Sequence, residues 1–205
     1  MVDYIMNELP ILTDRVNKTI KRYDCDESYK VEYKFNDFGY RSSTNYRDLL
    51  KQRKIVCLGC SFTEGVGLDE DETWPYLLSQ KIGLPFFNLG MVCGSQGYVM
   101  WQIQNVLDKI QTDNIFVLKP PPGRIFELRD DSFDNIQSWN YEKPGKSYGR
   151  LYKLNDFMLD SVCNTHRISY LSSTDYGDKW EKAKDGHHYG KDYQEMIANE
   201  FYKNM

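Results

Sequence analysis

Four short and almost unbroken apolar runs are the feature that most limits what this chain can fold into. They cover residues 55–59, 85–89, 115–118 and 167–171, and each is flanked by glycine, proline or polar residues. A strand with one solvent-exposed face alternates apolar and polar residues, whereas a strand buried on both faces carries apolar residues at successive positions. The runs therefore predict short strands inside a mostly parallel sheet.

Apolar stripes with helical spacing separate or follow these runs. Large apolar residues recur at intervals of three and four, as on the buried face of a helix. They are Trp74, Leu77, Leu78 and Ile82; Val99, Ile103, Val106, Leu107 and Ile110; and Tyr193, Met196, Ile197 and Phe201. This alternation predicts an α/β fold, a three-layer α/β/α sandwich around the sheet. A site is expected where loops follow the carboxyl ends of the strands.

The length of 205 residues suits one ordinary domain better than two. The first part, residues 1–50, is polar, rich in tyrosine and weakly periodic. Alternating aromatic residues within 33–42 indicate one short strand or an extended arm. We therefore expect residues 1–50 to form an N-terminal extension packed on the α/β domain of residues 51–205.

The charge balance and the lack of long apolar segments exclude several classes of partner. The chain carries 26 basic and 30 acidic residues, a formal net charge of −4, without a long basic run. This argues against nucleic-acid binding. No window approaches the roughly 20 apolar residues of a membrane span, and acids and a proline precede the first arginine, unlike a secretory signal. The expected location is cytoplasmic, in a bacterium or a virus-infected host cell, with no membrane partner and an open oligomeric state.

Five cysteines are an odd number in a chain large enough to fold without disulfides, which favours a reducing compartment. Cys57 and Cys60 have the spacing of a redox pair, but Cys57 lies in a predicted strand rather than in a turn that opens a helix. Coincidence is the favoured interpretation, and a thiol protein is kept as a weaker alternative. A zinc site would need a second close pair of cysteine or histidine residues at matching spacing, and His187 and His188 form the only other close pair in the sequence. No metal is therefore expected.

Two further patterns argue against a bound cofactor. The acidic run 69–72 lacks the alternating ligands and the glycine of a calcium loop. It precedes Trp74, where negative charge at a helix start complements the backbone dipole. The sequence lacks a phosphate-binding loop, which would end in lysine followed by serine or threonine. It also lacks a dinucleotide-binding fingerprint. No cofactor is therefore predicted.

A serine stands at the predicted functional edge. Ser61 follows the first apolar run within residues 59–65, Gly-Cys-Ser-Phe-Thr-Glu-Gly. A serine hydroxyl attacks at neutral pH only when a neighbouring imidazole takes its proton. A second motif loop, residues 88–95, follows the next strand to the same edge. The backbone amides of Ser61 and Gly94 are predicted to stabilise an oxyanion there.

An imidazole and a carboxylate near the end of the sequence complete the set. Asp185 and His188 are three residues apart and precede the last predicted helix. His188 is predicted to be the general base, with His187 as the alternative. Asp185 would accept the other ring N–H and fix the tautomer. The structural alternative is that Asp185 only caps the helix.

The segment after the third run leaves two questions open. Arg124 lies on the predicted edge, where its guanidinium could bind a carboxylate or phosphate of a substrate. A surface ion pair with Glu127 or Asp130 is the more ordinary role. Residues 123–150 mix aromatic and polar side chains. They form either a sugar- or partner-binding surface or a long loop packed by its own aromatic rings.

These motifs, in this order, resemble those of the SGNH or GDSL hydrolases. Residues 59–65 are similar to the first block of that family, residues 88–94 to its second block, and Asp185-Gly186-His187-His188 to its last. Residues 36–41 are similar to a stretch that precedes the first block in many members. The resemblance covers about residues 53–205. It implies a flavodoxin-like fold with Ser61, His188 and Asp185 as a catalytic triad.

The resemblance implies a serine hydrolase that cleaves a small ester through an acyl-serine intermediate. The implied substrate is a small molecule or carbohydrate carrying an O-acetyl or short acyl group. The chain departs from the family at Cys60, where the family has aspartate, and it lacks the asparagine of the third block. The alternative is therefore an inactive SGNH-fold binding or structural protein, of viral origin among the options.

Overall fold

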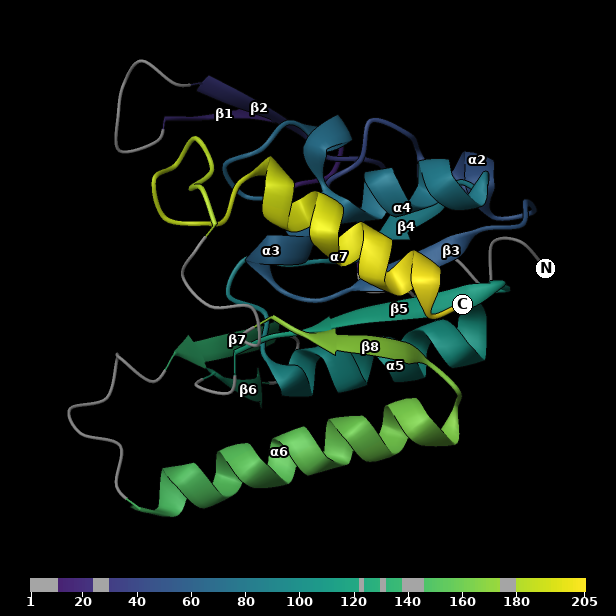
Figure 1. The fold of residues 1–205 in the computed structure, drawn as a ribbon. Helices are drawn as coiled ribbons and strands as arrows, with labels where there is room; N and C mark the ends of the chain where they lie inside the picture. Colours follow the sequence, from purple (N-terminus) through teal and green to yellow (C-terminus); the bar gives the residue numbers. More distant parts are fainter. Residues whose placement is uncertain (1–10, 24–29, 122–123, 130–131, 138–145, 174–179) are drawn as a thin grey trace.

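The computed structural model describes the chain except for residues 1–10, 24–29, 122–123, 130–131, 138–145 and 174–179 (Figure 1). Its centre is a four-stranded sheet in the order β4-β3-β5-β8. All three neighbouring pairs are parallel. The strands are β3 (Ile55–Leu58), β4 (Phe86–Asn88), β5 (Asn114–Lys119) and β8 (Ser169–Ser172). The four predicted runs therefore form the sheet, with boundaries shifted by one or two residues.

Helices cover both faces of this sheet, as Figure 1 shows. On one face, α4 (Trp74–Ile82) and α7 (Lys191–Lys203) pack on Ile55 and Cys57 of β3. On the other, α5 (Gln96–Lys109) and α6 (Lys146–Thr165) pack on Val56 and Leu58. Successive residues of β3 thus enter different apolar clusters, as expected for a strand buried on both faces. The predicted three-layer α/β/α sandwich is confirmed.

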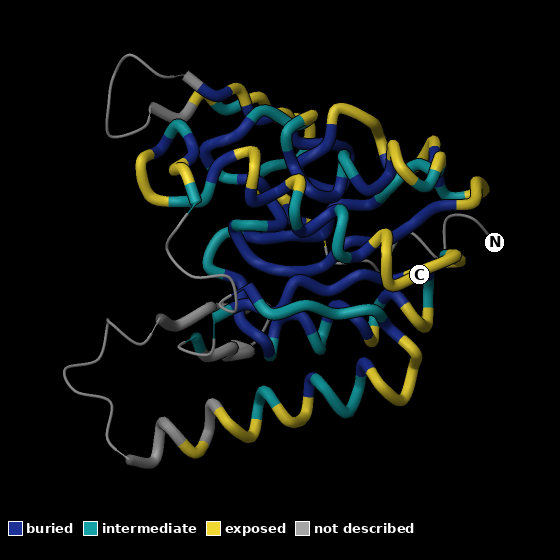
Figure 2. Tube along the Cα trace, viewed as in Figure 1, coloured by how far each residue is buried: buried dark blue, intermediate teal, exposed yellow. Residues whose placement is uncertain are grey.

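The distribution of burial follows these layers. β3 is buried throughout, and β5 is buried from its second residue on. The edge strand β8 is only half-buried along its length (Figure 2). The loops and turns that follow β3 and β4 are buried as well, although they contain several polar side chains. Polar groups removed from water in this way require partners within the protein.

The N-terminal part of the described chain contains more structure than one strand or arm. β1 (Thr19–Tyr23) pairs antiparallel with β2 (Lys30–Lys34), and α2 (Tyr46–Leu49) follows. The Tyr46 ring stacks on Phe87 of the sheet with 4.0 Å between ring centroids. The Tyr46 hydroxyl donates to the Asn88 carbonyl and accepts the Asn88 N–H, satisfying the outer edge of β4. A domain boundary at residue 50 stays a prediction.

The segment after β5 differs from the long loop that was one interpretation of residues 123–150. β6 (Arg124–Arg129) and β7 (Ser132–Gln137) form an antiparallel hairpin, and α6 begins at Lys146. The rest of the segment and most of its aromatic side chains lie outside the described residues, so the choice between a binding surface and self-packing stays open. α6 packs through Leu159 and Cys163 and leaves Phe157 exposed.

Two short elements connect β3 to α4. They are α3 (Ser61–Glu64) and the 3-10 helix η1 (Glu70–Glu72). η1 contains most of the predicted acidic run, and Asp69 and Glu72 form a capping box at its start. The acidic run therefore belongs to a helix start, although to η1 rather than to α4. Within the described part of the chain, no helix is both long and apolar enough to cross a membrane.

Candidate active site

Ser61 lies at the carboxyl end of the sheet, as the sequence predicts. β3 ends at Leu58, and after two residues Ser61 begins α3. The Cys60 carbonyl accepts the N–H groups of Thr63 and Glu64, both at 2.9 Å, which fixes the turn of α3. The Ser61 N–H stands at the first position of this helix, where no acceptor within the helix is available. Ser61 itself is only 3% exposed.

The His188 ring joins Ser61 to Asp185. His188 Nε2 lies 2.9 Å from Ser61 Oγ. On the other side of the ring, His188 Nδ1 lies 2.5 Å from Asp185 Oδ2. Of the two neighbouring histidines, the one whose ring reaches Ser61 is therefore His188, while the His187 amide contacts Asp185.

Asp185 is held as an acceptor by its own turn. Its Oδ1 accepts the N–H groups of His187 at 3.0 Å and His188 at 2.9 Å. Burial alone would raise the pKa of Asp185, but the hydrogen bonds from the His188 ring and from the two amides outweigh it, so the pKa lies below its ordinary value. An ionised carboxylate at this place can orient the ring by accepting its Nδ1–H. α7 begins at Lys191 with Gly190 as its cap, so Asp185 does not cap that helix.

The Asp185 turn is fixed to the loop that follows α3. The Gly67 carbonyl accepts the Lys184 N–H at 3.0 Å. Gly67 has φ +81°, and a Cβ atom on it would lie 2.9 Å from Asp185 Cγ. A side chain is therefore excluded by both conformation and space. Lys184 Nζ also pairs with Asp69 at 2.5 Å, so the segments that carry Ser61 and His188 are linked outside the triad itself.

Aromatic rings pack around the imidazole. The Phe62 ring meets His188 edge to face, with 5.3 Å between centroids. The same ring stacks on Tyr189 at 5.5 Å. Such contacts restrict the His188 ring and cover part of it from water. Phe62 carries no motif that predicts this contact, and its position directly after Ser61 was the available signal.

The second motif loop lies against α3. A Cβ atom on Gly90 would lie 2.4 Å from the Glu64 nitrogen, so only glycine allows this approach of two backbones. Asn88 anchors the loop: its Nδ2 donates to the Thr63 carbonyl at 2.9 Å, and its Oδ1 accepts the Gly90 N–H. The Gly94 N–H donates to the Met91 carbonyl at 2.9 Å within a turn. Its predicted role as an oxyanion donor stays a prediction.

Arg124 contacts the second motif loop from β6. Its Nη1 donates to the Gly94 carbonyl at 3.2 Å. Its Nε is buried and has no hydrogen-bond partner among the described residues. This places the guanidinium beside the loop of the predicted oxyanion donor. Its role toward a substrate stays a prediction.

Two buried charged residues support the site and were not assigned a role from the sequence. The Arg41 guanidinium donates to the carbonyls of Glu64, Gly65 and Leu68, which end α3 and the loop after it. Burial lowers the pKa of Arg41 below its ordinary value, while nearby Tyr33 and Glu64 act in the opposite direction. The available signal was the stretch 36–41, which resembles a family stretch preceding the nucleophile. The second residue is Glu64, whose side chain is 1% exposed.

The thiol chemistry that was kept as a weaker alternative finds little support. Cys57 is fully buried in β3, and burial raises the pKa of its thiol well above the ordinary value. A thiol that stays protonated is a poor nucleophile. Among the residues that the structure describes, no group of three or more histidine, cysteine or acidic side chains could hold a metal ion.

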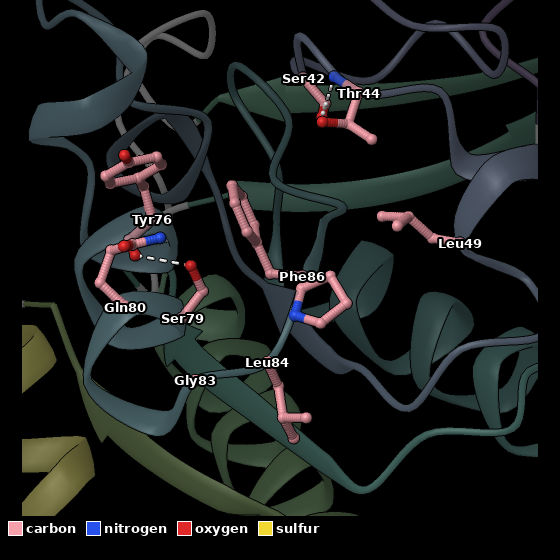
Figure 3. Close-up of a pocket in the computed structure, with 10 residues that line it drawn as sticks. Ser42, Thr44, Leu49, Tyr76, Ser79, Gln80, Gly83, Leu84 and Phe86 are labelled. Carbon is pink, nitrogen blue, oxygen red and sulfur yellow. Dashed lines mark hydrogen bonds between the residues drawn. The ribbon is translucent and has the colours of Figure 1, made fainter.

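A cavity of about 380 Å³ lies apart from the triad, at the amino end of β4. Figure 3 shows the side chains that line it, drawn from the loop before α2, from α4 and from the start of β4. The lining residues are Ser42, Thr44, Leu49, Tyr76, Ser79, Gln80, Gly83, Leu84, Pro85 and Phe86. No triad residue belongs to it.

No protein-family model and no curated protein match this sequence. Among solved structures, the chain matches a protein assigned to the G-D-S-L family of lipolytic proteins from Desulfitobacterium hafniense DCB-2, at 12% identity over 75% of this chain and 100% of the other, with a TM-score of 0.47. A G-D-S-L family member from Veillonella parvula DSM 2008 matches at 16% identity over 74% and 97%, with a TM-score of 0.43. Est24, a carbohydrate acetylesterase from Sinorhizobium meliloti, matches at 9% identity over 75% and 98%, with a TM-score of 0.43. These matches include proteins of the family that the sequence motifs resemble.

Proposed function

We propose that the protein is a serine ester hydrolase of the SGNH type, with Ser61 as nucleophile, His188 as general base and Asp185 as the residue that orients His188. One observation carries the proposal: a continuous chain of hydrogen-bond distances runs from Ser61 Oγ through the His188 ring to the Asp185 carboxylate. Ser61 comes from a segment 127 positions away from His188, whereas Asp185 and His188 share one turn. Such convergence of nucleophile, base and orienting acid defines the triad arrangement.

The reaction follows from this order of groups. Ser61 Oγ attacks the ester carbonyl carbon while His188 Nε2 takes the hydroxyl proton. The Asp185 carboxylate stabilises the resulting imidazolium through Nδ1–H. His188 then returns the proton to the leaving alkoxide as the C–O bond breaks, which leaves an acyl-serine and releases the alcohol. A water molecule, deprotonated by the same imidazole, then attacks the acyl carbon. The imidazolium returns the proton to Ser61 Oγ as the C–O bond to serine breaks, which releases the acid and restores the hydroxyl.

The charge on the tetrahedral intermediate requires donors beside Ser61. We propose the Ser61 N–H as the first donor, because it has no acceptor within α3. The Gly94 N–H is the second, and it would have to exchange the Met91 carbonyl for the oxyanion. Arg124, which touches the Gly94 carbonyl, would add positive charge near the same loop.

We propose a small acyl group on the substrate, such as the acetyl or short acyl ester of a carbohydrate. The surroundings of the nucleophile support a small group: Ser61 is buried, and 22% of the His188 side chain is exposed. Phe62 packs against His188 and limits the space beside it further. The carbohydrate part of the proposal rests on the family resemblance.

Turnover of p-nitrophenyl acetate and covalent labelling by a fluorophosphonate test the function directly. The wild-type protein should hydrolyse the ester and carry one label on Ser61, located by mass spectrometry after digestion. Ser61→Ala should lose both properties. Ser161→Ala is the matched control, because Ser161 lies on α6, away from Ser61, and its hydroxyl donates to the Phe157 carbonyl of that helix.

The second candidate is a binding or structural protein that keeps the fold without the reaction. The engagement of the Gly94 N–H with Met91 and the missing third-block asparagine favour this candidate. A folded wild-type protein that neither turns over p-nitrophenyl acetate nor takes up the fluorophosphonate would select it.

A further inference from the structure

We infer that Glu64 is a positioning residue, whose carboxylate holds the second motif loop at a fixed distance from the nucleophile. The inference rests on the proposed function. Glu64 and Ser61 are the last and first residues of the same short helix, α3. A contact from Glu64 to residues 88–95 therefore sets the loop directly relative to Ser61.

The two oxygens of the Glu64 carboxylate face two different parts of the chain. Oε2 accepts the N–H of Val92 at 2.5 Å, within the second motif loop. Oε1 accepts from Arg15 Nη1 at 3.2 Å, from the N-terminal segment. The Glu64 side chain is 1% exposed, and that of Arg15 is 18% exposed. A buried carboxylate is tolerated when it is paired and hydrogen-bonded, and both conditions are met here.

The position of Val92 makes this contact relevant to the reaction. Val92 directly precedes Cys93, which has φ +63°, and Gly94, the proposed oxyanion donor. A non-glycine residue in the left-handed region is held there by its surroundings. Two backbone contacts flank Val92: the Met91 N–H donates to the Gly59 carbonyl at 3.3 Å, and the Gly94 N–H donates to the Met91 carbonyl at 2.9 Å. Between them, the Glu64 carboxylate holds Val92 itself to α3. Loss of the Glu64 contact should therefore release the Cys93 turn and displace the Gly94 amide.

Arg15 gives the N-terminal segment a part in the site. Its guanidinium also lies over the Phe35 ring, 5.3 Å from the centroid, next to β2. It thus holds the Glu64 carboxylate from the side away from the loop. We infer that Arg15 acts through Glu64 and not on the substrate.

Glu64→Gln is the principal test, with Arg15→Gln as a second variant that leaves the buried carboxylate in place. Glu64→Gln keeps the size of the side chain but brings an NH₂ group against either Arg15 or the Val92 N–H. We expect kcat for p-nitrophenyl acetate to fall about 10²-fold with KM nearly unchanged, because misplacement by about 1 Å costs this much. Arg15→Gln should give a smaller fall in kcat. Hydrogen exchange at the Val92 amide should become faster in both variants, independently of activity.

Asp37→Asn is the matched structural control. Asp37 is also a buried carboxylate of the N-terminal part, but its oxygens accept the Tyr46 and Arg47 N–H groups at the start of α2, away from the second motif loop. Asp37→Asn should lower the melting temperature but leave kcat and hydrogen exchange at the Val92 amide unchanged. If Glu64→Gln keeps wild-type kcat and Val92 protection, or if Asp37→Asn loses as much kcat, the inference is overturned while the hydrolase proposal stands. A wild-type protein without turnover or labelling overturns both.

Discussion

The two ends of the central sheet differ in how their polar groups are used. At the carboxyl end, side chains from distant segments bond to one another, as His188 does with Ser61. At the amino end of β4, the two hydrogen bonds drawn between residues that line the cavity of Figure 3 each stay within one segment. The Ser79 hydroxyl donates to the Tyr76 carbonyl one turn earlier in α4, and Ser42 Oγ accepts the Thr44 N–H. Convergence of distant groups, rather than volume, therefore marks the end where chemistry is expected.

The largest difference between the two ends should appear when the base is removed. His188→Ala should reduce kcat/KM for p-nitrophenyl acetate by about 10⁶-fold, because the hydroxyl then lacks a proton acceptor. Tyr76→Ala, in the cavity, should leave kcat/KM close to that of the wild type. Steady-state kinetics on both folded variants check this prediction, and a comparable loss in Tyr76→Ala would connect the cavity to the reaction.

Asp185→Asn should have the next largest effect. An amide in place of the carboxylate leaves the His188 ring without its charged partner and favours the wrong tautomer, so kcat should fall by roughly 10⁴-fold. Binding of substrate should change little, because Asp185 does not touch Ser61. Comparison of kcat with KM separates the two effects. A fall confined to KM would contradict the orienting role.

Gly90→Ala should distort the catalytic end through the backbone. Its Cβ atom would meet the Glu64 nitrogen at 2.4 Å, and overpacking of this kind costs about 1–3 kcal/mol. Gly83→Ala is the matched control for added bulk, since a Cβ atom there meets nothing within 4 Å and its φ of +75° leaves a backbone cost alone. Urea unfolding should show the larger loss of stability for Gly90→Ala. If both variants lose the same stability, the backbones at Gly90 and Glu64 lie far enough apart in solution to admit a Cβ atom.

The smallest expected effect is a pH dependence of stability. The pKa of Asp185 is lowered in the folded protein, so its hydrogen bonds stabilise the fold above the ordinary value of 3.8 and this contribution is lost as the pH falls through the folded pKa. The difference in melting temperature between wild type and Asp185→Asn should therefore shrink below about pH 4. Thermal unfolding from about pH 6 to about pH 3 measures it. A melting-temperature difference that grows as the pH falls would contradict a lowered pKa of Asp185 in the folded protein.

The sheet and the meeting of Ser61, His188 and Asp185 at its edge could be predicted because their signals are local. An apolar run followed by glycine marks β3 and places Ser61, and the short spacing of Asp185 and His188 suffices to propose a pair. The three-dimensional structure was needed to choose His188 over His187, because the side chains of neighbouring residues point in different directions. Similarly, Gly94 was chosen for its place in a motif, and sequence alone could not show that its N–H already has an acceptor.

Other parts could not be predicted because their partners are far away in sequence or their pattern is weak. Arg15 and Glu64 are 49 positions apart, and no motif connects them. The hairpin of β6 and β7 lies in a segment where aromatic and polar residues do not alternate regularly, which made it look like a loop. α6 escaped prediction because it exposes Phe157, so its apolar stripe is not confined to one face.

The bond between Ser61 and His188 joins residues 127 positions apart. During synthesis, the nucleophile therefore leaves the ribosome long before its base exists, and a chain that stops short of Asp185 has neither base nor orienting acid. Labelling of Ser61 can consequently report on assembly: it would register only molecules in which α3 and the turn that carries Asp185 and His188 have already met.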